Sequence, residues 1–306
     1  MEPKILITDI ADFFNISVQA VHQKIKKNNL DCKRIQNKLY LSHSDSKKII
    51  DFEFNKKIFA FQIVKGGVGK TTLLHSIATK ISLLGAKTLL IDLDQQANLT
   101  QACNIDSRDL PVMINVINGD NKIEDLIIPV CDGIDLIPSE IENAVIDSTL
   151  LIKQIRLEKV YSKIFNKLKN NYDFIFIDCP PSLGPSVTAA SLASDIIVAP
   201  VTPEKFSLKG LEILKSELTK LKEDYDYAPE MKIILNKFDS RTAIAHDVLA
   251  AMFSNNEYKD NMYKSFVRVN QEFVNVTLNN TSIFDTTRKT AAKEDIALIA
   301  KELVGA

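Results

Sequence analysis

Residues 58–72 read IFAFQIVKGGVGKTT, an apolar run that leads into a glycine-rich loop and the start of a helix. The run predicts a buried strand, and the helix is expected over residues 71–84. Glycines let the backbone N–H groups of the loop turn toward one point, where the positive end of the helix dipole also attracts anions. The segment therefore predicts a phosphate-binding loop made of Gly66, Gly67, Val68, Gly69, Lys70, Thr71 and Thr72.

Two side chains at the start of the helix extend this prediction to a metal-bound nucleotide. Lys70 is placed to reach the β- and γ-phosphates, and the Thr71 hydroxyl is placed to bind Mg²⁺. The strict pattern GxxxxGK[ST] has glycine where this chain has Val64, and a dinucleotide pattern has glycine where this chain has Thr72. Because lysine followed by threonine serves phosphate and metal, we expect ATP and Mg²⁺ as ligands.

Beyond the loop, short apolar segments alternate with amphipathic ones. Near-continuous apolar strands separated by helices are typical of a parallel sheet that helices cover on both faces. We therefore expect an α/β fold, a P-loop NTPase domain over residues 58–306. The expected strands are 58–64, 88–93, 133–138, 174–178, 195–200 and 231–236.

Residues 1–50 combine short helices with a concentration of positive charge. Between residues 18 and 48 there are eight Lys or Arg against two Asp, on a chain whose net charge is −1. A basic patch of this kind favours contact with nucleic-acid phosphates, although a solvated lysine surface remains an alternative. Ser17 is a good N-cap for a helix over residues 18–27, with Val18, Val21 and Ile25 facing inward.

The same residues predict a small winged helix-turn-helix domain, followed by a polar linker over residues 51–57. The second helix of a helix-turn-helix enters the major groove, and a basic hairpin over residues 32–42 would serve as the wing. The turn of this hairpin is expected near Gln36 and Asn37. The side chains expected to contact DNA from this domain are Gln19, Gln23, Lys24, Lys27, Arg34 and Lys38.

Length and composition limit the remaining possibilities. The 306 residues, 45% hydrophobic and 25% charged, suit one large domain with a small appendage. No apolar run is long enough to predict a membrane span, and the N-terminus lacks the pattern of a signal peptide. The four cysteines stand far apart, which predicts reduced thiols without a disulfide framework or a zinc site. We therefore expect a cytoplasmic protein.

The lysine ahead of the glycines carries a family resemblance. KGGVGKTT (65–72) resembles the deviant Walker A motif KGGxGK[ST] of the ParA/MinD ATPases. In that family the first lysine reaches across a dimer interface to the partner's nucleotide. The resemblance implies an ATP-dependent homodimer in which Lys65 acts in trans, so that Lys65 and Lys70 are both catalytic residues.

Two later segments match the same family. IDLDQQANLT (91–100) resembles its switch I segment DxDPQ, with Gln95 in place of proline, and implies that Asp94 positions the attacking water. Asp92 is then assigned to the surroundings of the metal. FIFIDCPPS (174–182) ends a strand in Asp178, the Walker B position, which would hold Mg²⁺ through water.

The resemblance also covers the base-binding side and the C-terminus. LNKFDSRT (235–242) implies that Asn236 reads the adenine edge, and Pro200 and Thr202 match the base-flanking loop. Residues 282–303 resemble the family's C-terminal signature, ending in a core helix. The segment SFVRVNQ departs from IPRNxR by placing Gln271 where a second arginine often falls. Candidates for sequence-independent DNA contact are Arg241, Lys264, Arg268, Arg288 and Lys289. Arg241 is the best match to a DNA-binding arginine of the family, whereas each of the other four could equally be a plain surface charge.

Taken together, these segments resemble plasmid-partition ParA proteins of the SopA-like type, which carry an N-terminal winged helix-turn-helix extension. The resemblance implies a nucleoid-associated, DNA-segregating ATPase with slow turnover until DNA and a ParB-type centromere-binding partner stimulate it. It also implies autorepression through the N-terminal domain. The alternative is a nucleotide-sensing repressor without a transport role. Membrane cycling of the MinD type would need an amphipathic C-terminal helix, whereas KEDIALIAKELVGA is typical of a core helix.

Overall fold

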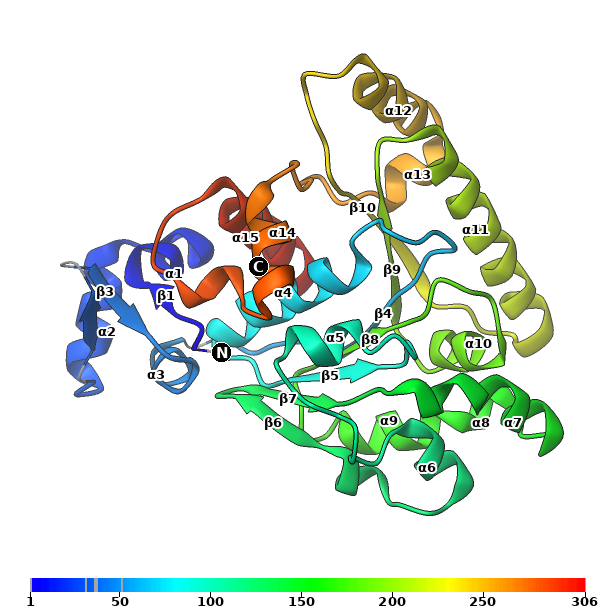
Figure 1. Ribbon diagram of the computed structural model, residues 1–306. Helices are drawn as coiled ribbons and strands as arrows, with labels where there is room; N and C mark the ends of the chain where they lie inside the picture. The colour runs from blue at the N-terminus through cyan, green and yellow to red at the C-terminus, as the bar shows by residue number, and fades with distance from the viewer. Residues whose placement is uncertain (1, 31, 36–37, 51, 306) are drawn as a thin grey trace.

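The computed structural model describes residues 2–30, 32–35, 38–50 and 52–305. Its centre is a seven-stranded sheet in the order β10-β9-β4-β8-β5-β7-β6, with helices on both faces (Figure 1). All neighbouring strands are parallel except β6 and β7. The predicted α/β fold is confirmed. The strands of this sheet are β4 (Lys57–Phe61), β5 (Thr88–Asp92), β6 (Ile128–Cys131), β7 (Ile134–Ile137), β8 (Phe174–Asp178), β9 (Ile196–Val201) and β10 (Glu230–Leu235).

Alternate residues of the central strands enter two different apolar layers. Phe59 and Phe61 of β4 pack with α4 and α15, whereas Ile58 and Ala60 pack toward α10 and α11. Burial on both faces explains why these strands read as unbroken apolar runs. The antiparallel edge strand β6 was not predicted, because it is only half-buried and contains Pro129, a residue confined to edge positions in sheets.

Fifteen α-helices and three short 3-10 helices lie within the described residues. The C-terminal helix was predicted to be a core helix, and its residues Ile296, Ile299 and Leu303 are buried as expected. The α-helices are α1 (Ile7–Phe14), α2 (Val18–Lys27), α3 (His43–Ile49), α4 (Lys70–Leu83), α5 (Asn98–Ala102), α6 (Met113–Asn118), α7 (Ile146–Ile152), α8 (Leu157–Val160), α9 (Ser162–Leu168), α10 (Pro185–Leu192), α11 (Lys205–Tyr225), α12 (Ala243–Ser254), α13 (Asn256–Asn261), α14 (Gln271–Asn279) and α15 (Ala291–Val304). The 3-10 helices are η1 (Ile123–Leu126), η2 (Ile141–Val145) and η3 (Ile283–Asp285).

The N-terminal segment, residues 2–50, folds as helices around a small antiparallel sheet. Its strands β1 (Ile5–Leu6), β3 (Lys38–Leu41) and β2 (Lys33–Ile35) pair in that order. The predicted cap is confirmed, because Ser17 accepts a hydrogen bond from the backbone N–H of Ala20 at 3.1 Å. Val18 was wrongly predicted to face inward and is 37% exposed. The turn predicted at Gln36 and Asn37 lies outside the described residues.

This segment packs tightly against α4 and the C-terminal residues. Its apolar side chains share a core with α4 and α15, and the His43 Nδ1 lies 2.7 Å from the carbonyl oxygen of Ser82. Gly133, at φ +84°, fits against the same histidine: a Cβ there would lie 2.2 Å from Nδ1. The docking therefore depends on a glycine far away in the sequence, and Gly133→Ala would force His43 to move.

The predicted polar linker contains two packed aromatic side chains. Phe52 lies 5.6 Å from Phe14 of α1 and 5.1 Å from Phe54, measured between ring centroids. Phe54 continues the row to Phe174 of β8, at 5.7 Å. The boundaries 1–50, 51–57 and 58–306 remain a prediction, but this joint is apolar at its centre and ties the N-terminal segment to the large sheet.

Candidate nucleotide-binding site

The glycine-rich loop joins the end of β4 to the start of α4. Gly67 and Gly69 have φ values of +76° and +86°, a region that L side chains rarely adopt, and Gly69 is the N-cap of α4. A Cβ on Gly69 would lie 2.6 Å from the Nδ2 of Asn236. These two glycines therefore permit both the turn and its close approach to the end of β10.

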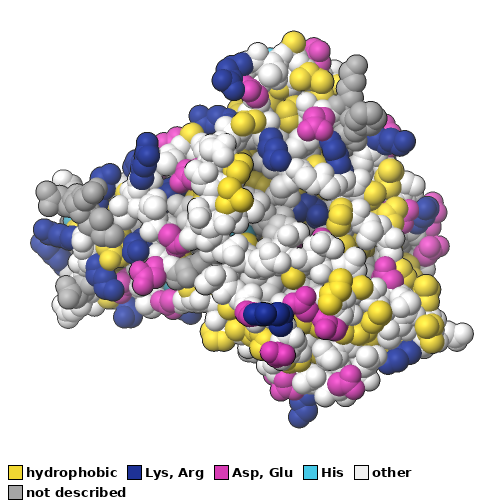
Figure 2. Space-filling view, in the orientation of Figure 1, with side chains coloured by type: hydrophobic (Ala, Val, Ile, Leu, Met, Phe, Trp, Pro, Cys, Tyr) yellow, Lys and Arg dark blue, Asp and Glu magenta, His cyan; other side chains and the backbone are white. Residues whose placement is uncertain are grey.

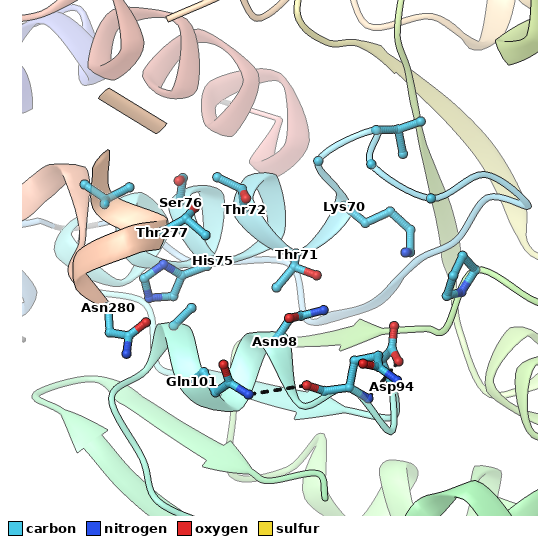
Figure 3. A pocket seen from close by; sticks show the side chains of 18 of the residues that line it. Lys70, Thr71, Thr72, His75, Ser76, Asp94, Asn98, Gln101, Thr277 and Asn280 are labelled. Carbon is cyan, nitrogen blue, oxygen red and sulfur yellow. Dashed lines mark hydrogen bonds between the residues drawn. The ribbon is translucent and has the colours of Figure 1, made fainter. Parts of the chain in front are cut away.

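The loop opens into a cavity of about 350 Å³ between α4, α5 and α14. Figure 3 shows Lys70 and Thr71 on α4, with Asp94 coming from the segment after β5. The seven loop residues predicted to bind phosphate all line this cavity, together with Asp94. The remaining lining residues, which sequence reasoning did not single out, are His75, Ser76, Gln96, Asn98, Gln101, Ala102, Pro181, Val276, Thr277, Asn280 and Thr281.

Two of the three residues predicted for the magnesium site, Thr71 and Asp178, meet at the head of α4. The Thr71 hydroxyl donates to Asp178 Oδ2 at 2.6 Å, while Asp178 Oδ1 is buried without a hydrogen-bond partner. Burial raises the pKa of Asp178, and Lys70 and the Thr71 hydrogen bond lower it. A buried carboxylate oxygen without a partner, beside a hydroxyl and a lysine, fits an oxygen-ligated Mg²⁺.

Asp92 holds the loop after β5 in shape. Its two oxygens accept hydrogen bonds from the backbone N–H groups of Asp94 at 3.1 Å and Thr100 at 2.9 Å, and from the Thr100 hydroxyl at 2.8 Å. That hydroxyl accepts in turn from the N–H of Ser139 at 3.0 Å. Burial raises the pKa of Asp92, and the neighbouring Asp178 raises it further. Asp92 therefore holds the backbone of the loop that carries Asp94, and its predicted place near the metal remains a prediction.

Asp94 lines the cavity and is largely buried. It follows β5, whose last residue Asp92 pairs in register with Asp178 at the end of β8. One of its oxygens accepts the N–H of Gln96 at 3.0 Å, which orients the carboxylate. The residue is 7% exposed. The parallel strands thus bring all three aspartates to one edge of the sheet.

The two residues that follow β10 support the phosphate-binding loop through hydrogen bonds to its carbonyl oxygens. Asn236 donates from Nδ2 to the carbonyl oxygen of Val68 at 2.7 Å, and Lys237 donates from Nζ to that of Gly67 at 2.8 Å. Asn236, Pro200 and Thr202 come together here because β9 and β10 are neighbours, but none of the three lines the cavity. The contact of Lys237 with the loop was not predicted from the sequence. The signal that could have indicated it is the Asn-Lys pair directly after a strand.

Lys65 lies at the mouth of the loop and turns back onto its own chain. Its Nζ donates to Glu204 Oε2 at 2.6 Å, and the side chains of Lys65 and Glu204 are 22% and 61% exposed. The ion pair with Lys65 lowers the pKa of Glu204. Glu204 was not predicted from the sequence, because 139 residues separate it from its partner.

The predicted DNA-contacting cations occupy different environments. Arg241 is 84% exposed and paired with Asp239, while Arg268 is held by Asp295, a buried carboxylate. Lys289 lies 3.9 Å from both Asp9 and Asp12. The other predicted DNA contacts are exposed, apart from the half-buried Lys24; they are Gln19, Gln23, Lys27, Arg34, Lys38, Lys264 and Arg288. Lys and Arg side chains gather around the N-terminal segment (Figure 2).

A phosphate-binding loop ahead of a helix, with Thr71 against the aspartate that ends β8, defines a P-loop nucleotide-binding domain. The family model described as AAA domain matches residues 56–233. The sporulation initiation inhibitor protein Soj of Bacillus subtilis is 30% identical over 217 residues, covering 69% of this chain and 83% of Soj. The chain belongs to this family, as a ParA/Soj-type member.

Solved structures share the fold. A plasmid partition protein from Borrelia burgdorferi bound to AMPPNP has a TM-score of 0.65 at 23% identity, covering 82% of this chain and 100% of that one. Cobyrinic acid a,c-diamide synthase from Mycobacterium smegmatis, with a bound ATP analogue and magnesium, has a TM-score of 0.68 at 24% identity, covering 81% and 94%. Among the described residues, none of the helices has both the length and the apolar character needed to cross a membrane.

Proposed function

We propose that this chain is an ATP-hydrolysing DNA-partition protein that works as an ATP-dependent homodimer. The observation that carries the proposal is the contact between Thr71 and Asp178 beside the buried Lys70, at the head of a helix whose preceding loop can cradle phosphates. Structures of the same fold hold ATP analogues, one of them with magnesium. ATP and Mg²⁺ are therefore the ligands we assign to the site.

Different residues of the site serve different parts of ATP hydrolysis in this proposal. The loop N–H groups and Lys70 bind and neutralise the phosphates, and Thr71 with Asp178 would hold Mg²⁺, which supplies further charge neutralisation. Asp94 orients the attacking water, and Asp92 keeps Asp94 in place through the loop hydrogen bonds. Phosphoryl transfer depends mostly on such positioning, so turnover is slow until the site is completed.

Lys65 completes the site of the second protomer in this proposal. In the single chain it is bound to Glu204, so dimer formation exchanges one anionic partner for another, the triphosphate held by the twin. Solvent reaches the Glu204 side of this ion pair, since the Glu204 side chain is 61% exposed, and this screening weakens the pair. Dimerisation then prepares the bound nucleotide for hydrolysis, because each site gains a cation that it lacks in the single chain.

DNA and a centromere-binding partner of the ParB type complete the function. The bound dimer holds nucleoid DNA without sequence preference through exposed cations of the large domain, foremost Arg241, which is 84% exposed and paired with the neighbouring Asp239. For Arg268 a structural role is better supported than DNA contact, because it forms an ion pair with the buried Asp295. The ParB-type partner and DNA together accelerate hydrolysis and release the dimer, and this cycle moves a replicon.

This function is tested by measuring phosphate release from Mg²⁺-ATP with and without DNA. We expect slow turnover alone and faster turnover when DNA and the cognate centromere-binding protein are both present. Turnover that neither addition changes would contradict a partition role, even if nucleotide binding were intact.

The N-terminal segment is proposed to be a winged helix-turn-helix that reads an operator and represses the chain's own operon. Its exposed α2 residues Gln19, Gln23 and Lys27 lie on the side of the helix opposite the buried Val21 and Ile25. Deleting the segment is a poor test, because its apolar residues share the core of the large domain. Substitutions on the exposed side of α2 leave that packing intact.

We expect the double variant Gln23→Ala, Lys27→Ala to bind operator DNA at least about tenfold more weakly, because a lost base or phosphate contact costs about 1–3 kcal/mol. Its ATP-dependent binding to unrelated DNA should stay unchanged. Fluorescence anisotropy with a promoter fragment and a scrambled fragment measures both. The matched control is Gln154→Ala, Lys163→Ala, two exposed residues far along the chain. Equal operator affinity in the two double variants would refute the assignment of α2.

A further inference from the structure

A second cavity, of about 510 Å³, lies between α1 and the C-terminal residues of the chain. Its walls come from α1, from Lys80 near the end of α4, and from residues 284–301. It shares no lining residue with the cavity at the phosphate-binding loop. In Figure 1 its walls lie where the blue α1 approaches the red α15, at the junction of the N-terminal segment and the large domain.

Lys80 is a buried cation in the wall of this cavity. The residue is 2% exposed, and its Nζ lies 5.9 Å from the ring centroids of both Phe13 and Phe284. Among the described residues it has no hydrogen-bond acceptor and no carboxylate at ion-pair distance. Burial lowers the pKa of Lys80 to about 8, although the carboxylates of Asp9 and Asp12 oppose this shift. The ammonium is therefore still mostly protonated at neutral pH. Asp9 and Asp12 act on it only from beyond ion-pair distance, whereas a buried charge is costly and is normally paired at close range.

The other charged groups around the cavity already have partners. Lys289 lies 3.9 Å from both Asp9 and Asp12, and Lys301 donates to Asn15 Oδ1 at 3.2 Å. Lys293 donates to the carbonyl oxygen and the hydroxyl of Thr286, and Glu294 lies 3.8 Å from Arg268. With these groups occupied, Lys80 is the cation in the lining that lacks a polar partner within the described chain.

We propose that this cavity binds a small ligand with one anionic group on an apolar body, whose anionic group pairs with Lys80. The aromatic rings of Phe13 and Phe284 and the side chain of Leu298 supply the apolar wall. A cavity of 510 Å³ falls in the range of small-molecule sites, which combine apolar walls with a few polar groups that fix the ligand's orientation. The chemical class is an organic monoanion, such as a carboxylate, sulfonate or phosphate ester with an aryl or alkyl group.

Occupancy of this site would fasten the N-terminal segment to the large domain. Asp9, Asp12 and Phe13 belong to α1, whereas Lys80 belongs to α4, so the complete cavity exists only when the two are docked. A ligand that binds only the docked arrangement stabilises it in proportion to its concentration. Lys80 also lies on the same helix as Lys70, ten residues or about 15 Å along its axis, which links the two cavities through one rigid element.

The test uses the full chain and the fluorescent probe 8-anilinonaphthalene-1-sulfonate, an aromatic monoanion, with ADP and Mg²⁺ in excess. We expect saturable binding of one probe molecule per chain. Lys80→Met should weaken it at least about tenfold, because an ionic hydrogen bond is lost while apolar contact remains. Ala297→Trp, which fills the cavity and keeps Lys80, should abolish it. The matched control Lys220→Met, on the exposed surface of α11, should leave the affinity unchanged.

Circular dichroism spectra and ADP affinity show whether each variant is folded. Equal probe affinity in Lys80→Met and Lys220→Met would overturn the proposal, as would unchanged binding in a folded Ala297→Trp. If Lys80→Met does not fold, Ala297→Trp decides the matter alone, because its substitution leaves the buried ammonium in place.

Discussion

Lys70→Ala is expected to bind ATP about 100-fold more weakly than the wild type, or not measurably. Lys70 is 8% exposed and stands beside Asp178 at the start of α4. Charged hydrogen bonds to phosphate contribute about 1.5–3 kcal/mol each, and two of them account for a loss of this size. Titration with a fluorescent ATP analogue in the presence of Mg²⁺ measures it.

Lys65→Ala is the matched control for this loss. Lys65 is the other lysine of the same loop segment, yet in the single chain it is bound to Glu204 and does not line the cavity. Its substitution should change nucleotide affinity of the monomer by no more than a few-fold. Wild-type affinity in a folded Lys70→Ala would mean that the cavity at the head of α4 is not the nucleotide site.

Asp94→Ala is expected to bind ATP normally, to form the dimer and to hydrolyse ATP about 100-fold more slowly. The carboxylate faces the cavity and is oriented by the N–H of Gln96, and within the described chain it makes no hydrogen bond to the loop that holds phosphate. Positioned acid–base or water-orienting groups typically contribute 10²–10⁴-fold to rate. Phosphate release gives the rate, and light scattering of the ATP-loaded protein gives the mass.

Two comparisons make the Asp94 result specific. Asp120→Ala removes an exposed carboxylate outside the cavity and should turn over as the wild type does. Asp94→Asn preserves the size of the side chain and its acceptor for Gln96, so a similar loss of rate would assign the effect to the charge. Normal hydrolysis by Asp94→Ala would remove Asp94 from the mechanism.

The parts of this structure that depend on residues close together in the sequence could be predicted from the sequence. The glycine-rich loop, the apolar strands and the start of α4 follow from local composition, and the strand ending in Asp178 was placed correctly to the residue. The meeting of Thr71 with Asp178 followed from the motif, because parallel strands bring their carboxyl ends to one edge.

Contacts between distant segments could not be predicted in the same way. The hydrogen bonds from Ser139 through Thr100 to Asp92 join three segments, and no local pattern marks them. The same is true of Glu204 beside Lys65 and of α14 over the cavity. Val18 shows the opposite failure: it has the correct helical spacing relative to the buried Val21 and Ile25, yet as the first residue of α2 it stays 37% exposed.

The central claim is that Lys65 leaves Glu204 and completes a site on a second chain. The most direct measurement is the molar mass in solution with AMPPNP and Mg²⁺, by light scattering after gel filtration, for the wild type, Lys65→Ala and Glu204→Gln. The account predicts twice the 34.3 kDa of one chain for the wild type and Glu204→Gln, and a single chain for Lys65→Ala. A wild type that binds the nucleotide and stays monomeric, or a Lys65→Ala variant that dimerises as well as the wild type, would contradict it.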